Sequence, residues 1–479
     1  MSILSFEFLL FIAVIFCVYY VLPTGVRWLA LLIGSAFFVF LSGWQSVLHL
    51  GAIVLGTWLG GLALERVKRK RGLLCLLLIL EFGALILVKQ DTSRAAPLGL
   101  SYFTFQSAGL LMDVYRGKVK AQRNVWKVML FVGYFLQLSQ GPISSWKDLG
   151  EQLLEGHPLR PVSFVSGFQL MLWGYFKKMV LADRLAAATA VLTQETGALP
   201  GWMAAGGVLL YTVRLYADFS GGMDVVRGIS RMLGIELPEN FRRPFFALSV
   251  AEYWRRWHIT LGGWFRQYLL YPLTISKMGL KFGKAASRWL GKKTGRAMPT
   301  AVTTFLVFLL IGIWHTFSWN AVIYGAYFGL LMAASILLDP LWKKMNRRWK
   351  LGQKRWMYPW RLVRTWLLIF PAQFFAFTES TAQSLAVIRQ CFAGWSFSGA
   401  VDKLTGIMSA KEWGIAGMAF VILMLVDILC EAGFAPCERL AKSRIWVRWP
   451  ILLLLLLGIC VFGIYGPAGD SSAFLYTQF

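Results

Sequence analysis

The 479-residue sequence has little charge, few acidic residues and few histidines. It carries 23 Asp and Glu residues against 49 Lys and Arg residues, and only four histidines. Its six cysteines form no CxxC pair, and most of them lie in apolar runs. This pattern favours buried free thiols over a disulfide framework or a zinc site. We therefore expect neither structural disulfides nor a bound metal.

Several catalytic signatures are also absent. The sequence contains no GxSxG, HExxH or Walker loop and no paired-carboxylate spacing, so hydrolase, metalloprotease and NTPase functions lack support. No basic residue precedes the first apolar run, whereas a cleavable signal peptide begins with a positive region. We expect that run to be a retained helix. Without internal repeats or a soluble stretch, the chain is expected to form one membrane-embedded domain over residues 1–479.

Long apolar runs dominate what is present. Apolar residues make up 57% of the chain, and the mean hydropathy is +0.58. Runs of about 17–22 residues are long enough to cross a hydrocarbon core. The pattern predicts an all-α polytopic membrane protein. The candidate spans are residues 3–22, 27–42, 46–64, 73–89, 125–143, 162–181, 201–217, 299–318, 320–338, 361–378, 412–432 and 449–466.

The net charge of +26 is concentrated in short segments between the apolar runs. Membrane topology and anionic lipid headgroups account for this pattern better than nucleic acid does. The positive-inside rule places basic loops such as 66–71, 277–296 and 343–355 in the cytoplasm. On that basis we expect both termini outside, and we expect 299–318 and 320–338 to form an out-and-back hairpin.

Residues 218–275 do not fit this pattern of crossings. They are too polar to face lipid and too aromatic for a solvated loop. Polar backbone at membrane depth is tolerated where it is buried in protein or lines a water-filled cavity. We expect re-entrant or amphipathic helices entering from the cytoplasmic side, with Glu252 paired to Arg255 and Arg256 at helical spacing. The alternative is an interfacial amphipathic helix without chemistry.

His315 lies late in an apolar run that begins near Pro299. An ionisable side chain deep in a membrane segment is costly and therefore suggests function. A neutral imidazole in a poorly solvated site could act as a base, because burial disfavours the imidazolium. The alternative is a histidine hydrogen-bonded between packed helices.

A series of stretches, in matching order over most of the chain, resembles the membrane-bound O-acyltransferase family. The branch is the bacterial one that includes the alginate and peptidoglycan O-acetyltransferase membrane subunits and the teichoic acid D-alanyl transferase. The matching stretches are residues 97–106, 113–117, 140–143, 176–178, 182–183, 218–221, 237–241, 253–261, 264–266 and 314–315. The chain departs from the family pattern at Thr316, where many members have glycine, and this leaves the substrate open.

The resemblance implies a fold and a site. The fold would be a ring of about 11–13 tilted helices with re-entrant helices around a central tunnel. His315 matches the family's signature histidine, and His258 matches its second histidine, so residues 218–338 would form the catalytic core. Candidates for lining the tunnel or binding substrate are Asp218, Asn240, Arg255, Arg256, Trp257, Arg266 and Trp314.

The resemblance also implies a reaction in the bacterial cytoplasmic membrane. An acyl group, with acetyl as our first choice, would pass from a cytoplasmic thioester to hydroxyls of an extracytoplasmic polysaccharide or envelope polymer. The donor, acetyl-CoA or an acyl carrier protein thioester, would be a co-substrate rather than a bound cofactor. D-alanyl transfer to teichoic acid stays open. A transporter for an envelope polysaccharide or lipid is the alternative from another class, although transporters usually contain repeats.

The last residues, 467–479, would form an extracytoplasmic tail. They include Tyr476 in a Phe-x-Tyr-x-x-Phe pattern that resembles the ends of bacterial members, where it is implicated as an acyl relay. On this hypothesis Tyr476 passes the acyl group to a secreted SGNH-type, esterase-like partner. The alternative is an aromatic anchor at the membrane interface.

Overall fold

The structure, a computed structural model, describes residues 1–90, 97–194, 199–350 and 354–465. The regular elements in these ranges are helices, and no strand is found among them. Six of the described helices are long and apolar enough to cross a membrane. They are α3 (Trp44–Arg66), α4 (Lys70–Gln90), α15 (Lys277–His315), α16 (Trp319–Trp349), α20 (Ala410–Glu431) and α22 (Ile445–Phe462). The prediction of an all-α polytopic membrane protein is confirmed, whereas the ring, the tunnel and the orientation stay predictions.

The chain divides into two compact units. Among the described residues, unit 1 contains Met1–Val180, Ala217–Glu239 and 433–465. Unit 2 contains Leu181–Tyr216 and Asn240–Ala432. Whether the whole chain acts as a single domain stays a prediction.

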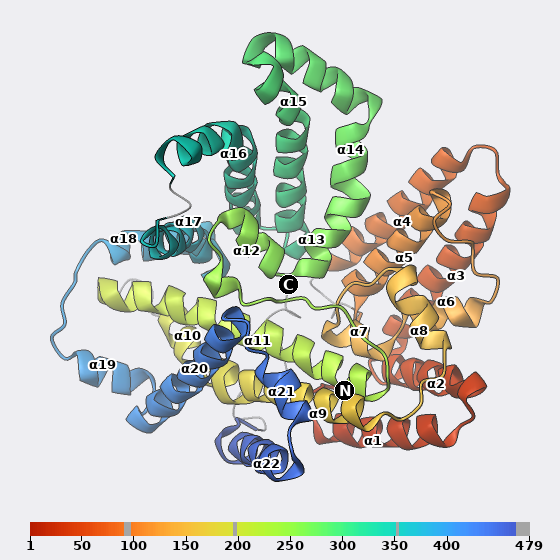
Figure 1. The fold of residues 1–479 in the computed structure, drawn as a ribbon, viewed down its shortest axis with the longest axis horizontal. Helices are drawn as coiled ribbons and strands as arrows, with labels where there is room; N and C mark the ends of the chain where they lie inside the picture. The colour runs from red at the N-terminus through yellow and green to blue at the C-terminus, as the bar shows by residue number, and fades with distance from the viewer. Residues whose placement is uncertain (91–96, 195–198, 351–353, 466–479) are drawn as a thin grey trace. The chain divides into compact units, whose positions relative to one another are not determined.

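Unit 1 is built mainly from the N-terminal helices. In addition to α3, α4 and α22 it contains α1 (Phe6–Val21), α2 (Arg27–Phe40), α5 (Leu100–Tyr115), α6 (Val125–Val132), α7 (Phe135–Gln140), α8 (Glu151–Leu154), α9 (Pro161–Tyr175) and α21 (Pro436–Lys442). Helices α3, α4 and α5 pack against one another (Figure 1). The apolar runs predicted at 3–22, 27–42, 46–64 and 73–89 are therefore helices.

The predicted continuous span over residues 125–143 is wrong. Helix α6 ends at Val132, its cap residue Gly133 donates its N–H to the Met129 carbonyl, and α7 begins at Phe135. The N–H of Phe135 donates to the Ser35 hydroxyl on α2 rather than to a carbonyl of α6. The break is a tertiary effect, because a side chain from another helix supplies the hydrogen bond that would otherwise continue α6.

Unit 2 holds the remaining helices. In addition to α15, α16 and α20 it contains α10 (Asp183–Gln194), α12 (Val250–Arg256), α13 (Ile259–Phe265), α14 (Tyr271–Ile275), α17 (Met357–Phe377), α18 (Thr381–Cys391) and α19 (Ala400–Ile407). Helix α11 (Gly201–Met232) contributes residues to both units. It continues well beyond residue 217, so the predicted end of a span at 217 is wrong, whereas re-entrant or amphipathic helices entering from the cytoplasmic side stay a prediction for 218–232. Short helices do occupy much of 250–275.

The predicted hairpin of 299–318 and 320–338 is present as α15 and α16, which pack side by side (Figure 1). Glycines bring the two helices together, since a Cβ at Gly312 would lie 2.3 Å from the carbonyl oxygen of Ala321. The basic segment 277–296 is not a loop as predicted. It forms the first part of α15, which bends at Gly291, a residue in the left-handed region with φ 78°. Gly291 is the one residue of α15 whose backbone is not helical, so the basic residues on both sides of it lie on helix.

Candidate active site

His315 is the last residue of α15, and the next helix begins at Trp319 after a cap in which the Ser318 hydroxyl accepts from the Ala321 N–H. The imidazole is half-buried and packs against Trp314, with the ring centroids 4.5 Å apart. Because Gly312 lets α15 and α16 approach closely one turn earlier, the packing of the hairpin fixes where His315 lies.

His258 occupies the turn between α12 and α13, outside the six apolar helices. Its backbone is left-handed, with φ 46° and ψ 53°, and only 3% of the residue is exposed. This conformation costs a non-glycine residue about 1–2 kcal/mol, so neighbouring contacts must maintain it. Two backbone hydrogen bonds do so: Ile259 N–H donates to the Asn240 carbonyl at 3.0 Å, and Arg242 N–H donates to the Arg256 carbonyl at 2.8 Å.

The side chain of Asn240 determines the tautomer of His258. Its Oδ1 accepts from the backbone N–H and from the hydroxyl of Thr260, both at 3.0 Å. It also lies 3.3 Å from Nδ1 of His258. An N–H can only donate, so the Asn240 atom facing Thr260 must be the amide oxygen, and Nδ1 of His258 must carry the proton. The basic nitrogen of the neutral imidazole is then Nε2.

The two histidines influence each other within unit 2. Burial lowers the pKa of His258 well below its ordinary value, and the charge of nearby His315 lowers it further. His258 is therefore neutral at pH 7, as a proton acceptor has to be. Both histidines and Asn240, identified from the sequence, belong to the same unit.

Arg256 is held in an ion-pair network. It bonds Glu252 at 2.6 Å and both carboxylate oxygens of Glu431 at 2.8 and 2.9 Å, and Glu431 also accepts from Arg243 at 2.9 Å. The predicted pairing of Glu252 is confirmed for Arg256 but is wrong for Arg255, which makes no ion pair with Glu252. Glu431 was missed because it lies at the end of α20, distant in sequence and at the edge of an apolar run. No sequence signal connects it to Arg256.

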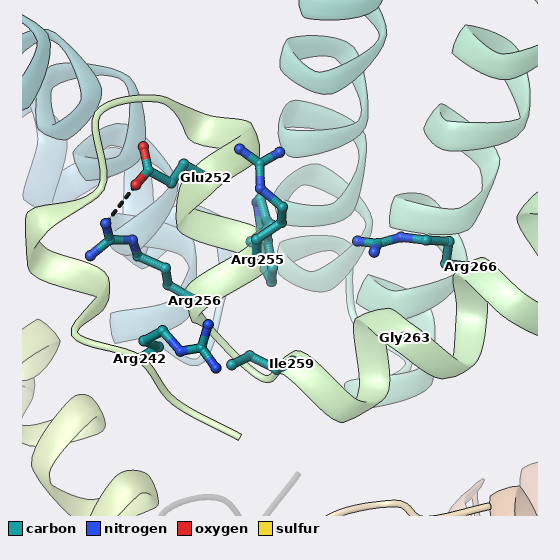
Figure 2. A pocket seen from close by; sticks show the side chains of 8 residues that line it. Arg242, Glu252, Arg255, Arg256, Ile259, Gly263 and Arg266 are labelled. Atoms are coloured by element: carbon teal, nitrogen blue, oxygen red, sulfur yellow. Dashed lines mark hydrogen bonds and ion pairs between the residues drawn. The ribbon is translucent and has the colours of Figure 1, made fainter. Parts of the chain in front are cut away.

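Arg255 does not share this network but lines a cavity of about 470 Å³ within unit 2, which we call the arginine cavity. Figure 2 shows its polar lining and the ion pair between Glu252 and Arg256. The charged residues that line it are Arg242, Glu252, Arg255, Arg256 and Arg266. The three arginines predicted as substrate contacts, Arg255, Arg256 and Arg266, thus share one cavity.

Two tryptophans of this segment are packing residues. Trp257 is buried, stacks on Tyr253 with centroids 5.7 Å apart and meets Phe241 edge-on at 4.9 Å. Trp254 on α12 packs edge-on against Phe308 of α15 and Phe328 of α16, each at 5.0 Å. The latter contacts connect the helix before His258 to the hairpin that ends in His315. Whether Trp257 also touches substrate stays a prediction.

Asp218 belongs to unit 1, where its carboxylate pairs with Lys178 at 2.6 Å with both side chains almost fully buried. Lys177 pairs with Asp224 at 2.7 Å in the same region. Both lysines lie on a π-helical turn of residues 176–182 that follows α9. These contacts stabilise the packing of α9 against α11. The catalytic assignment of Tyr476 and the tail 467–479 lie outside the described residues.

Comparison with known proteins gives relatives over most of the sequence. The chain is 32% identical over 356 residues to a Pseudomonas aeruginosa protein named alginate O-acetylase AlgI, covering 68% of this chain and 64% of that protein. The corresponding protein of Pseudomonas putida is 30% identical over 398 residues, covering 80% of this chain and 75% of the relative. A teichoic acid D-alanyltransferase of Bacillus subtilis is 27% identical over 54% of this chain and 63% of its own length.

The chain thus spans somewhat less than two thirds of the P. aeruginosa relative and three quarters of the P. putida one. No family model matches the sequence. The named relatives are all members of one family, and they are about 30% identical to this chain over most of its length. The chain therefore belongs to the membrane-bound O-acyltransferase family.

Proposed function

We propose that this protein is a membrane O-acyltransferase acting on an envelope polymer. The observation that carries the proposal is the pair of nearby histidines in unit 2, one of them held by Asn240 as a neutral imidazole. His315 takes the proton from the acceptor hydroxyl as that oxygen attacks the thioester carbonyl. The C–S bond then breaks and the thiolate leaves. The arginines near His258 stabilise the charge that develops on the carbonyl oxygen.

We further propose the direction and the substrates of transfer. The donor is a cytoplasmic thioester, either acetyl-CoA or an acyl carrier protein thioester, and the acceptor is a hydroxyl of an extracytoplasmic polysaccharide. The first choice of acyl group is acetyl, which accords with the relatives named alginate O-acetylase. In the proposed relay the Tyr476 hydroxyl is the first acceptor and attacks the thioester. With a secreted SGNH-type partner, a polysaccharide hydroxyl then attacks the tyrosine ester, and the tyrosine oxygen leaves and takes up the proton.

The test is mass spectrometry of envelope polymers from cells with the wild-type protein, without it, and with His315→Ala. We expect acylation to disappear in the deletion and in the variant while the protein is still expressed. His49→Gln is the matched control, because within the described ranges this histidine bonds only the Gln45 carbonyl one turn away in α3, and it lies far from the site in sequence. Retained acylation with His315→Ala would overturn the proposal and would leave transport of an envelope substrate as the better reading.

The relay requires a separate test. Tyr476→Phe keeps the aromatic ring and removes the hydroxyl, so the relay predicts loss of polymer acylation with normal protein levels. A fully active Tyr476→Phe protein would show that the tyrosine is an interface anchor instead.

D-alanyl transfer is the second candidate. It is favoured by the similarity to the B. subtilis protein named teichoic acid D-alanyltransferase. The two products differ in mass and in nitrogen content, so the same mass spectra discriminate them. A gene neighbourhood with a carrier protein and its ligase would favour alanyl transfer, whereas one with a secreted esterase-like transferase would favour acetyl transfer.

A further inference from the structure

We propose that the carboxyl group of Glu81 in α4 is a proton-binding site, which holds one hydrogen ion at pH 7 and donates it to the hydroxyl of Ser107 in α5. The site belongs to unit 1, whereas both histidines belong to unit 2. It is therefore a further binding site that does not depend on acyl transfer. Its ligand is a proton, and its chemistry is that of a neutral carboxylic acid enclosed by apolar helices.

Glu81 lies in the middle of the apolar part of α4, where it is the one charged residue between Arg71 and Lys89. Only 6% of the residue is exposed, because it lies where α4 packs against α3 and α5 (Figure 1). One turn away, a Cβ at Gly60 of α3 would lie 2.6 Å from the Leu77 side chain, so this glycine allows a close approach of α3 and α4. The carboxyl group is thus enclosed by protein within a membrane-spanning helix.

Within the described residues, no counter-ion neutralises Glu81. The residue makes no ion pair there, and its Oε2 atom is buried without a hydrogen-bond partner. A carboxylate buried in this way takes up a proton rather than stay charged.

Other charged and titratable groups of the three helices lie at a distance from the site. Each is at least five residues along its helix from Thr57, Glu81 or Ser107, which is about 7.5 Å at a rise of roughly 1.5 Å per residue. The nearest ones along each helix are His49 and Glu65 in α3, Cys75 and Lys89 in α4, and Tyr102 and Asp113 in α5.

The hydrogen bonds around Glu81 also call for a proton on it. Thr57 Oγ1 lies 2.6 Å from the Ile53 carbonyl oxygen and 2.5 Å from Ser107 Oγ. Ser107 Oγ is in turn hydrogen-bonded to Glu81 Oε1. The two hydroxyls supply two hydrogens for these three contacts, and a carbonyl or an ionised carboxylate can only accept.

The count closes only for the neutral acid. With Glu81 ionised, one of the three contacts has no hydrogen of its own. With Glu81 protonated, the acid donates to Ser107, and Ser107 donates to Thr57. Thr57 then donates to the Ile53 carbonyl, so each contact has one hydrogen and no hydroxyl is shared.

The same geometry favours a proton over a metal ion. Oxygen ligands of a metal ion are separated by the ion, whereas the oxygens of Thr57, Ser107 and Glu81 lie at hydrogen-bonding contact with one another in sequence. Among the residues that the structure describes, no group of three or more His, Cys, Asp or Glu side chains could bind a metal. A proton fills the site without moving any of these oxygens.

The first experiment records infrared spectra of the purified full-length protein in lipid nanodiscs at pH 7. The difference between wild type and Glu81→Gln should contain the C=O band of a protonated carboxyl group, which glutamine lacks although it keeps the shape and a donor for Ser107. Glu65→Gln is the matched control, because Glu65 is an exposed carboxylate that accepts from the Ala121 N–H at 2.8 Å. Its difference spectrum should contain carboxylate bands. Carboxylate bands in the Glu81→Gln difference spectrum would overturn the proposal.

The second experiment labels the wild-type protein and so needs no variant that must fold. A hydrophobic carbodiimide enters the membrane and reacts with protonated carboxyl groups. The carboxyl O–H adds across one C=N bond, so that the proton moves to nitrogen and the carboxyl oxygen bonds to the central carbon. Migration of the acyl group from oxygen to nitrogen then gives a stable N-acylurea, and no group leaves.

Peptide mass spectrometry should find Glu81 carrying the mass of one reagent molecule, and this label should be lost in Glu81→Gln and kept in Glu65→Gln. Reagent found on exposed carboxylates such as Glu65 but not on Glu81 would contradict a protonated Glu81. Sodium chloride should leave the labelling of Glu81 the same as choline chloride does. Protection by sodium but not by choline would identify a metal ion as the occupant and would overturn the proton site.

Discussion

Asn240 offers the sharpest test of the site, because one buried oxygen holds the turn that carries His258. Asn240→Ala removes the acceptor for three donors, namely the N–H and hydroxyl of Thr260 and Nδ1–H of His258. The hydroxyl can rotate to another partner, but the other two donors stay buried. Leaving each unsatisfied costs about 1–3 kcal/mol, so the variant should lose roughly 2–6 kcal/mol of stability.

Asn240→Asp separates positioning from stability. The aspartate keeps the acceptor and places a negative charge beside His258, which should raise the pKa of this histidine by roughly 1–3 pH units. Raising the pKa means that the imidazole is protonated at higher pH. The acid limb of the kcat/KM profile for acyl transfer should therefore move upward by a similar amount, with activity recovering at alkaline pH.

The assay is acyl transfer by the purified protein as a function of pH, together with thermal unfolding of each variant. Asn124→Asp is the matched control, since Asn124 also accepts a backbone N–H as the cap of α6 in unit 1. An Asn240→Asp protein with the wild-type pH profile would refute the assigned tautomer and the influence of Asn240 on His258. An unfolded Asn240→Asp protein would contradict the expectation that the acceptor is preserved.

Three further predictions concern stability. Because the pKa of His258 is lowered in the folded protein, this histidine takes up a proton in the unfolded chain at a higher pH than in the folded one. The free energy of unfolding should therefore fall as pH drops below about 6.5, by up to about 1.4 kcal/mol per pH unit. His258→Asn, which tolerates the left-handed backbone, should remove that slope in unfolding measured from pH 7.5 to 5 (roughly the window in which histidine titrates). Lys178→Met should destabilise the protein by about 3–5 kcal/mol in thermal unfolding, because it removes an ion-pair partner of a buried carboxylate. Lys343→Met, at an ion pair with Asp339 in which both side chains are exposed, should cost less than about 1 kcal/mol, and equal losses would contradict the difference in burial. Gly312→Ala should separate α15 from α16 and reduce acyl transfer with a loss of roughly 1–3 kcal/mol, whereas Gly417→Ala, whose Cβ would meet no atom within 4 Å, should fold and transfer normally.

Much of the helical content was predictable because apolar runs record burial directly. The runs at 46–64 and 73–89 became α3 and α4, and the hairpin around His315 followed from two adjacent runs between basic segments. The wrong predictions concern two segments in which amino-acid composition does not discriminate between a helix and a turn. The break at Gly133 depends on Ser35 of another helix, and the basic segment 277–296 is helical although its charges suggested a loop.

The sequence predicted which residues belong to the candidate site but not how they are arranged. His258 and His315 were identified by an ionisable group in an apolar setting and by resemblance to a family. Their proximity, the left-handed turn at His258 and the oxygen that determines its tautomer depend on Asn240 and on α12, which no local pattern encodes. The sequence also could not predict that Arg256 forms ion pairs while Arg255 lines the cavity, because adjacent arginines look equivalent in the sequence.

The sequence by itself determined that this is a helical membrane protein with a histidine embedded in an apolar hairpin, because hydrophobic periodicity and the cost of buried charge are local properties. Tertiary structure alone decided which charges are neutralised. Glu431 reaches Arg256 across 175 positions of sequence and leaves Arg255 facing the cavity, while Lys178 neutralises Asp218 in the other unit. Pair formation between buried charges depends on distances of a few ångströms, which only the folded chain establishes.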